Sequence, residues 1–202
     1  MAAENYQLEL DRIIQKEQTD GRIPTLLLHS CCGPCSSYVV TYLQSYFKVT
    51  VLYYNPNIYP EEEYAHRLSE QARLLKELDV PLLTLPYEHG EFLSRIKGLE
   101  EEPEGGRRCE ECFRLRLEKT FELASEKGFD YFCTTLTVSP HKNASVINRV
   151  GMMICRTEAK ENEVSIMWLP SDFKKREGYK RSIELSKKYD LYRQTYCGCE
   201  FA

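Results

Sequence analysis

The chain has 202 residues, of which 42% are hydrophobic and 29% charged, as expected for one globular domain with a core of its own. Its formal net charge of −4 excludes a positive field over the whole surface, so a nucleic-acid partner would need a local basic patch. No apolar run approaches the length of a membrane span, and residues 1–20 lack the hydrophobic stretch of a secretory signal, so we expect a cytoplasmic protein with no membrane partner.

Predicted strands and helices alternate along the chain. Helical spacing of apolar residues predicts an N-terminal extension over residues 1–22, followed by a single α/β domain with a metal-cofactor site over residues 23–202. Strand–helix–strand order implies right-handed parallel units, so we expect a mostly parallel, Rossmann-like (adenine-nucleotide-hydrolase-like) sheet flanked by helices. The patterns predict strands from Leu26 and over 49–54, 80–85, 129–134 and 164–169, and helices over 35–46, 61–78, 87–96, 109–127, 144–155 and 182–188.

The nine cysteines are unevenly distributed. A disulfide framework is not expected in a reducing compartment, so clustered thiols indicate metal or redox chemistry. Cys133 and Cys155 stand alone within apolar runs and are expected in the core. The other seven form Cys31-Cys32-x-x-Cys35, Cys109-x-x-Cys112 and Cys197-x-Cys199.

The first cluster is compatible with two kinds of chemistry. Cys32 and Cys35, with Gly-Pro between them, match a thioredoxin-type dithiol at a helix start, but an adjacent Cys31 and a distant cysteine pair have no role in dithiol exchange. Four thiolates from Cys31, Cys32, Cys109 and Cys112 instead favour a metal pocket. Structural zinc sites usually pair two Cys-x-x-Cys motifs, so the adjacent Cys31 and Cys32 favour an iron–sulfur cluster over zinc. Cys35 is then either a ligand of a further metal or a packed thiol.

The C-terminal pair and one histidine are further candidates. Gly198 between Cys197 and Cys199 allows a strained, labile disulfide and hence a redox relay, with a flexible tail of incidental thiols as the alternative. Of the four histidines, His141 lies in a hydroxyl-rich loop and is the candidate for a functional role.

Two basic segments are candidates for contacts with RNA. Arg107 and Arg108 lie next to the second cysteine pair, and Lys174, Lys175 and, nearer the C-terminus, Arg193 lie among aromatic residues. Basic residues interleaved with aromatic ones suit a phosphate backbone with unpaired, stacked bases. The alternative is an ordinary solvated helix face.

Taken together, these motifs resemble the family of cobalamin-independent epoxyqueuosine reductases. The resemblance covers residues 26–199 in order, and it is the number of separate motifs that makes it specific. They are His29-Ser30-Cys31-Cys32-Gly33-Pro34-Cys35, Tyr54-Asn55-Pro56-Asn57-Ile58, Arg108-Cys109-x-x-Cys112-Phe113-x-x-Arg116-Leu117, Thr135-Leu136-Thr137-Val138-Ser139-Pro140-His141-Lys142, Asp172-Phe173-Lys174-Lys175 and Tyr192-Arg193-Gln194-x-Tyr196-Cys197-Gly198-Cys199.

The resemblance implies a two-electron removal of the epoxide oxygen from epoxyqueuosine at the wobble position of tRNA, giving queuosine. It also implies a 4Fe–4S cluster on Cys31, Cys32, Cys109 and Cys112, a redox-active pair at Cys197 and Cys199, a separate electron donor and no cobalamin. Some members of the family have aspartate at the position of Cys35, where an additional iron has been suggested. The candidates for the proton donor are His141, Tyr196 and a water molecule, and the sequence does not choose among them.

Two other functions compete with this interpretation. An ATP-dependent tRNA-modifying enzyme of the pyrophosphatase-loop type would share the sheet and the cysteine pairs, but it requires a glycine- and serine-rich phosphate loop where this chain has Cys31 to Pro34. A zinc-stabilised RNA-binding module would use the same thiols without catalysis.

Overall fold

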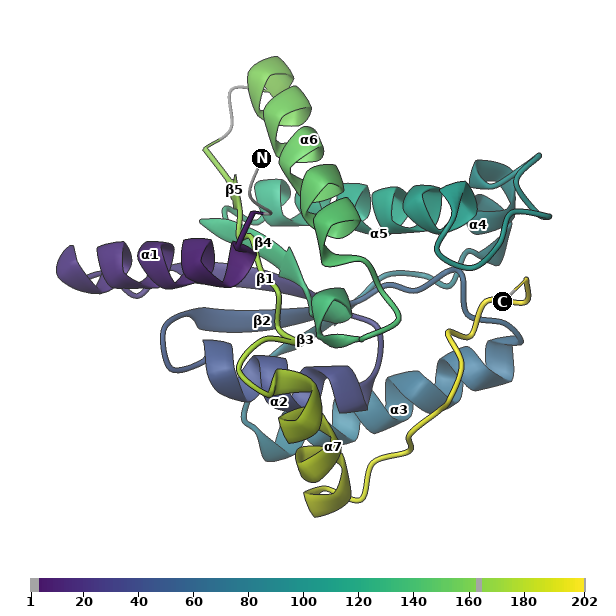
Figure 1. Ribbon diagram of the computed structural model, residues 1–202, viewed down its shortest axis with the longest axis horizontal. Coiled ribbons are helices and arrows are strands. Elements are labelled where there is room, and N and C mark those ends of the chain that lie inside the picture. Colours follow the sequence, from purple (N-terminus) through teal and green to yellow (C-terminus); the bar gives the residue numbers. More distant parts are fainter. Residues whose placement is uncertain (1–3, 163–164, 202) are drawn as a thin grey trace.

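A single parallel sheet lies at the centre of the chain (Figure 1). The computed structural model describes residues 4–162 and 165–201, and within these the sheet has five strands in the order β3-β2-β1-β4-β5. The predicted α/β, Rossmann-like fold is therefore confirmed. The strands are β1 (Thr25–Ser30), β2 (Lys48–Tyr53), β3 (Leu82–Thr84), β4 (Tyr131–Thr134) and β5 (Met167–Trp168).

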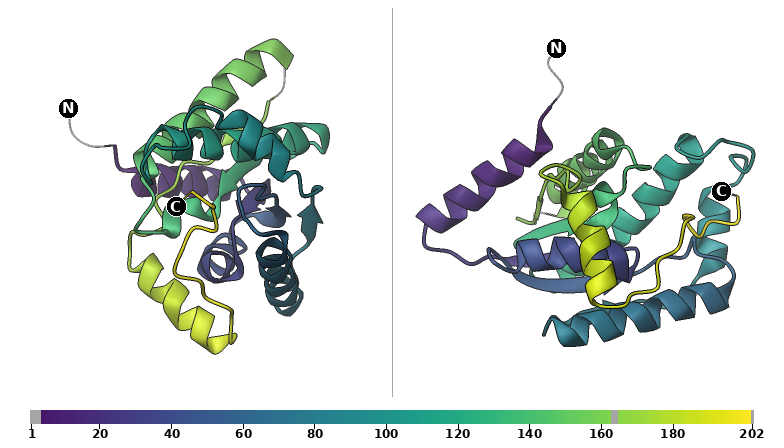
Figure 2. Two further views of the ribbon diagram at one scale, coloured as in Figure 1. Left: turned by 90° about the vertical axis from the view of Figure 1, so that its right-hand side faces the viewer. Right: turned by 60° about the horizontal axis from the view of Figure 1, so that its bottom comes forward.

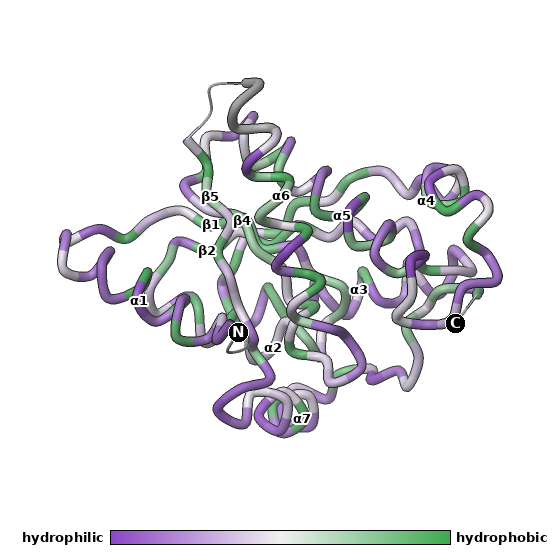
Figure 3. The backbone as a smooth tube through the Cα atoms, turned by 45° about the horizontal axis from the view of Figure 1, so that its top comes forward, coloured by the Kyte–Doolittle hydropathy of each residue, from purple (hydrophilic) through white to green (hydrophobic). Residues whose placement is uncertain are grey.

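Helices cover both faces of the sheet (Figures 1 and 2). On one face α4, α5 and α6 pack around Leu27 of β1, and on the other α1, α2, α3 and α7 pack around Leu26 and Leu28, because successive side chains of a strand point to opposite faces. The apolar residues accordingly concentrate along the strands (Figure 3). The helices are α1 (Tyr6–Thr19), α2 (Gly33–Leu43), α3 (Glu61–Glu77), α4 (His89–Arg95), α5 (Arg107–Glu126), α6 (Ala144–Asn162) and α7 (Gly178–Lys188), with a 3-10 helix η1 (Thr135–Val138).

Several boundaries differ from those predicted. Helix α2 begins at Gly33 and not at residue 35, because Pro34 fits the first turn of a helix, and this leaves Cys32 as its N-cap. Helix α7 begins four residues before the predicted position 182. The edge strands β3 and β5 are shorter than predicted, as edge strands commonly are, and residue 164 of the predicted last strand lies outside the described residues.

The strand order determines where a site can form. The chain moves from β1 outward to β2 and β3, and then returns to the other side of β1 to form β4 and β5. In such a sheet a crevice opens at the carboxyl ends of the two strands where the direction reverses, which here are β1 and β4. Cys31 follows β1, and Thr135 follows β4, so both border this crevice. No helix in the described part of the chain is long and apolar enough to cross a membrane.

Candidate metal centre

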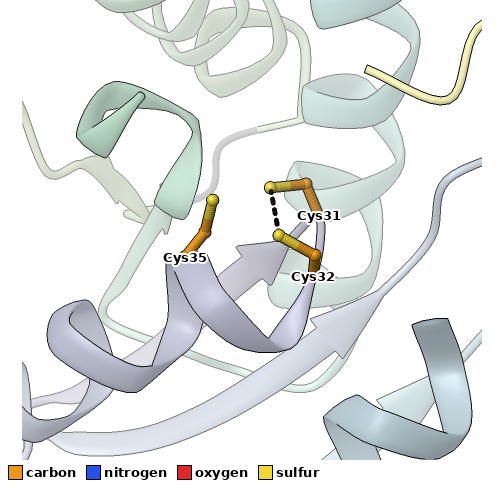
Figure 4. Close-up of side chains that lie close together, drawn as sticks. All are labelled: Cys31, Cys32 and Cys35. Carbon is orange, nitrogen blue, oxygen red and sulfur yellow. Dashed lines mark hydrogen bonds between the residues drawn. The ribbon is translucent and has the colours of Figure 1, made fainter. Parts of the chain in front are cut away.

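Three thiols meet at the carboxyl end of β1 (Figure 4). The sulfurs of Cys31, Cys32 and Cys35, called here the thiol trio, all lie within 4.8 Å of one another, and the Sγ atoms of Cys31 and Cys32 are 3.7 Å apart. The early start of α2 produces this grouping, because it places Cys35 one helical turn after the N-cap Cys32. Such a group offers three ligand atoms to one metal site.

The trio shares negative charge unevenly. Hydrogen bonds from Cys32 and then Cys35 hold the pKa of Cys31 well below its usual value. The same contact with Cys31 is the first cause that raises the pKa of Cys32, to about 12, and that of Cys35. Thiols this close resist joint ionisation unless a cation compensates their charge, and a bound metal supplies that compensation.

The second cysteine pair lies on α5, outside the 4.8 Å group. Cys109 and Cys112 occupy the first turns of this helix and pack, with Cys31, against one apolar cluster. The Sγ of Cys109 accepts a hydrogen bond from the Gly105 amide at 3.2 Å. Burial raises the pKa of Cys112 to about 12. The pair therefore faces the same end of the sheet as the trio, from the opposite layer.

Arg116 is a buried cation among these thiols. It follows Cys112 by one helical turn, is only 2% exposed, and donates from Nε to the Cys112 carbonyl at 3.1 Å. Burial lowers its pKa, but the thiols of Cys112, Cys197 and Cys31 raise it more, so the net shift is upward. Arg116 therefore stays charged in a pocket that holds thiols from three separate segments.

The C-terminal tail, residues 189–201, runs from α7 along α3 towards the start of α5 (Figures 1 and 2). Its Cys197 lines one cavity together with Cys31. Lys142 donates from Nζ to the Cys197 Sγ at 3.4 Å, and Arg67 donates to the Cys197 carbonyl at 3.0 Å. Cys199 packs instead against the apolar cluster near α5. All nine cysteines lie in the described part of the chain and are free thiols.

A cavity of about 450 Å³ lies above the thiol trio. It is lined by the trio, by residues after β2, by the segment 138–142 and by the tail. Among the described residues, no group pairs with five buried polar atoms of residues on its wall: the Oδ1 atoms of Asn55 and Asn57, the Nη2 atoms of Arg67 and Arg116, and the Oε1 of Gln194. A cavity with thiols below and unpaired polar groups at its side is suited to a polar ligand held over a metal centre.

Comparison with known proteins identifies the family. The sequence profile of a family described as "Epoxyqueuosine reductase QueH" matches residues 26–202. The chain belongs to the epoxyqueuosine reductase QueH family. A member from Staphylococcus epidermidis is 43% identical over 98% of this chain and 84% of its own, and one from Streptococcus pyogenes is 41% identical over 98% and 79%.

A solved structure shares the fold. The U34-tRNA thiolase NcsA from Methanococcus maripaludis, determined with its 4Fe–4S cluster, superposes with a TM-score of 0.55 over 96% of this chain and 67% of its own. At 13% identity this similarity shows the fold alone.

The basic residues of the QueH-family motifs do not all lie at the surface. His141 is exposed at the rim of the cavity, whereas its neighbour Lys142 contacts Cys197. Arg108 is buried and donates to the carbonyls of Glu100, Glu102 and Phe201, so this side chain is used inside the protein. That burial argues against a direct contact of Arg108 with RNA.

The remaining basic candidates lie at the surface or near it. Arg107 and Lys175 are exposed. Lys174 is partly buried, donates a hydrogen bond to the Thr137 carbonyl and forms an ion pair with Asp172. Arg193 is exposed, stacks over the Tyr179 ring at 5.5 Å and lines the cavity.

His29 is excluded as a metal ligand by its contacts. Its Nε2 donates to the Tyr54 carbonyl at 3.1 Å, and its Nδ1 then accepts from the Thr134 hydroxyl at 2.8 Å. Burial lowers its pKa to about 3, so the ring is neutral.

Sequence reasoning did not single out the two cations that contact the thiol site. Lys142 directly follows the selected His141, and Arg116 is the residue of α5 that shares a face with Cys109 and Cys112. The available signals were the family motifs, which contain both residues, and for Arg116 its helical spacing of three and then four residues along Cys109, Cys112 and Arg116.

Proposed function

We propose that this chain reduces epoxyqueuosine to queuosine at the wobble position of tRNA. The reaction removes the epoxide oxygen, consumes two electrons and two protons, and releases the oxygen as water. The observation that supports it best is the thiol trio at the floor of a cavity with unpaired polar groups on its wall, in a chain of the epoxyqueuosine reductase family. An electron donor outside this chain supplies the two electrons.

A 4Fe–4S cluster fits the donor set of this site. We assign its ligands as Cys31 and Cys32 at the end of β1 and Cys109 and Cys112 on α5, and the buried positive charge of Arg116 beside these thiols suits an anionic cluster. Cys35 lies within 4.8 Å of two of these sulfurs, which supports its role as ligand of an adjacent iron. When bound, these groups supply low-potential electrons and a Lewis acid for the departing oxygen.

Side chains around the cavity bind the nucleotide and donate the protons that the reaction consumes. Lys142 keeps a proton on Nζ close to Cys197 and is placed to donate it, while His141 at the rim is a second donor. Burial lowers the pKa of Lys142, but the thiols of Cys197 and Cys31 together raise it more, so the net shift is upward and the ammonium form is retained. Cys197 and Cys199 act in this proposal as the redox-active pair.

The surface near the cavity receives the tRNA. Arg193 with Tyr179, and Lys174 with Lys175, place positive charge and an aromatic ring at and beside the opening, as required for a single-stranded loop with a splayed base. Arg107 adds a further exposed charge near the start of α5. We place the enzyme in the cytoplasm, where its nine free thiols stay reduced.

The reaction is tested with anaerobically reconstituted protein and tRNA that contains epoxyqueuosine. With dithionite as reductant, digestion of the tRNA and mass analysis of its nucleosides should show queuosine in place of epoxyqueuosine. Protein with full iron and sulfide content that forms no queuosine would overturn the proposed activity. Stoichiometric zinc without iron after anaerobic purification would favour a zinc-stabilised RNA-binding module.

The ligand assignment is tested by cysteine-to-serine variants. Cys31→Ser, Cys109→Ser and Cys112→Ser should lose most of the iron and sulfide, whereas Cys133→Ser, a buried thiol on β4, is the matched control and should keep both. Cys35→Ser should keep the sulfide and lose only part of the iron. Unchanged iron and sulfide in both α5 variants would refute the assignment of Cys109 and Cys112.

A further inference from the structure

Arg116 lacks the partner that a buried arginine normally has. Among the described residues, no carboxylate lies within ion-pairing distance of its guanidinium, and its Nη2 atom is buried without a hydrogen-bond partner. Each of the two other buried arginines also has one guanidinium nitrogen without a partner, but the rest of its guanidinium is paired. Arg67 pairs with Glu63 at 2.6 Å, and Arg108 donates to three carbonyl oxygens. An unpaired buried charge is costly, so a compensating negative charge is expected at this position.

The groups around Arg116 identify that negative charge. Cys109, Cys112 and Arg116 follow one another at intervals of three and four residues, which places them on one face of α5. Arg116 also borders the cavity together with Cys31 and Cys197. Glu104 also lines this cavity, but it is exposed and makes no ion pair with Arg116. The buried anions available to Arg116 are therefore sulfurs and, in the proposed enzyme, the iron–sulfur cluster that these thiols would hold.

The charge of a cluster explains what the cation does. A 4Fe–4S cluster with its thiolates is an anion, and its one-electron reduction by an external donor adds a further negative charge. A nearby buried cation stabilises the more negative state, and the low dielectric constant of the interior strengthens the effect. We propose that Arg116 is the counter-cation of the cluster and that its positive charge raises the reduction potential. This inference rests on the cluster assigned in the proposed function.

The test is a redox titration of the reconstituted protein, in which the electron paramagnetic resonance signal of the reduced cluster is followed. Arg116→Met should make reduction harder by about tenfold in the equilibrium constant, or about 59 mV for one electron. Arg116→Lys keeps the charge and should stay within about threefold of the wild type, a shift well below that of a full lost charge. Arg114→Met is the matched control, because Arg114 lies on the same helix, pairs with Glu111 and should leave the potential unchanged.

The outcomes separate this inference from the proposed function. Wild-type protein without iron and sulfide would refute the cluster itself, whereas Arg116→Met with full iron content and an unchanged potential would overturn only the role of Arg116. If Arg116→Met does not assemble a cluster, Arg116→Gln and Arg116→Lys decide the matter. Assembly in the lysine variant alone supports a required charge, and failure of all three shows a requirement for guanidinium shape and overturns the inference.

Discussion

Substitution of Gly198 by alanine should detach the tail from the site. Gly198 is buried between Cys197 and Cys199 and has a φ of +95°, a conformation that residues with a side chain rarely adopt. An alanine Cβ would lie 3.0–3.1 Å from the guanidinium atoms of Arg67. Arg67 is held by Glu63 and by the Cys197 carbonyl and is not free to move aside.

The magnitude follows from these two effects. A residue with a Cβ in a left-handed conformation costs about 1–2 kcal/mol. Crowding against a fixed neighbour costs a further ~1–3 kcal/mol. Even the lower limits add to about 2 kcal/mol, which corresponds to an increase of about 30-fold in the population of the detached tail. The rest of the domain should remain folded, because the tail adds only two partly buried residues, Cys199 and Phe201, to the margin of one apolar cluster and none to the cluster on the other face.

Hydrogen exchange measures this detachment directly. The Tyr59 amide donates to the Gly198 carbonyl at 2.9 Å, so its exchange reports tail opening and should accelerate at least about 30-fold in Gly198→Ala. Gly128→Ala is the matched control, because Gly128 also has a positive φ, of +69°, but has open space around it. It should lower overall stability by about 1 kcal/mol without affecting the Tyr59 amide. Equal Tyr59 exchange in wild type and Gly198→Ala would refute the reasoning.

Three further predictions concern charge. Asp130 accepts hydrogen bonds from the backbone amide and the hydroxyl of Thr25, the first residue of β1, at 2.8 and 2.7 Å. Burial raises the pKa of Asp130, but these bonds help to lower it, and the net shift is downward. The ionised carboxylate therefore stabilises the folded state at neutral pH, and this contribution is lost in acid. In urea titrations, the free energy of unfolding should fall less between neutral pH and about pH 4 or below for Asp130→Asn than for the wild type. Lys142→Met should slow queuosine formation by about 10²-fold with unchanged iron content, and a wild-type rate would exclude proton donation by this residue. Joint replacement of Lys174 and Lys175 by alanine should weaken tRNA binding and reduce its salt dependence by about one unit of slope per lost phosphate contact, and unchanged titrations would remove them from the interface.

Local sequence determined the architecture and the position of the site in the fold. Alternating apolar runs predicted the parallel sheet, because each run carries the periodicity of its own element irrespective of its neighbours. The cysteines at the end of β1 and the start of α5 could likewise be placed, since parallel strands bring their carboxyl ends to one edge. The motifs from residue 26 to residue 199 were also sufficient to indicate the family.

Tertiary structure decided which side chains meet. Arg108 and Arg116 look alike as basic residues of one helix, yet one ends on carbonyl oxygens of a loop and the tail, and the other lies among thiols. Cys35 joins Cys31 and Cys32 only because α2 starts two residues earlier than predicted. Lys142, and not His141, contacts Cys197, because the C-terminal tail lines the same cavity as the segment 138–142, which is distant in sequence. Such contacts join segments far apart in sequence, and no local periodicity encodes them.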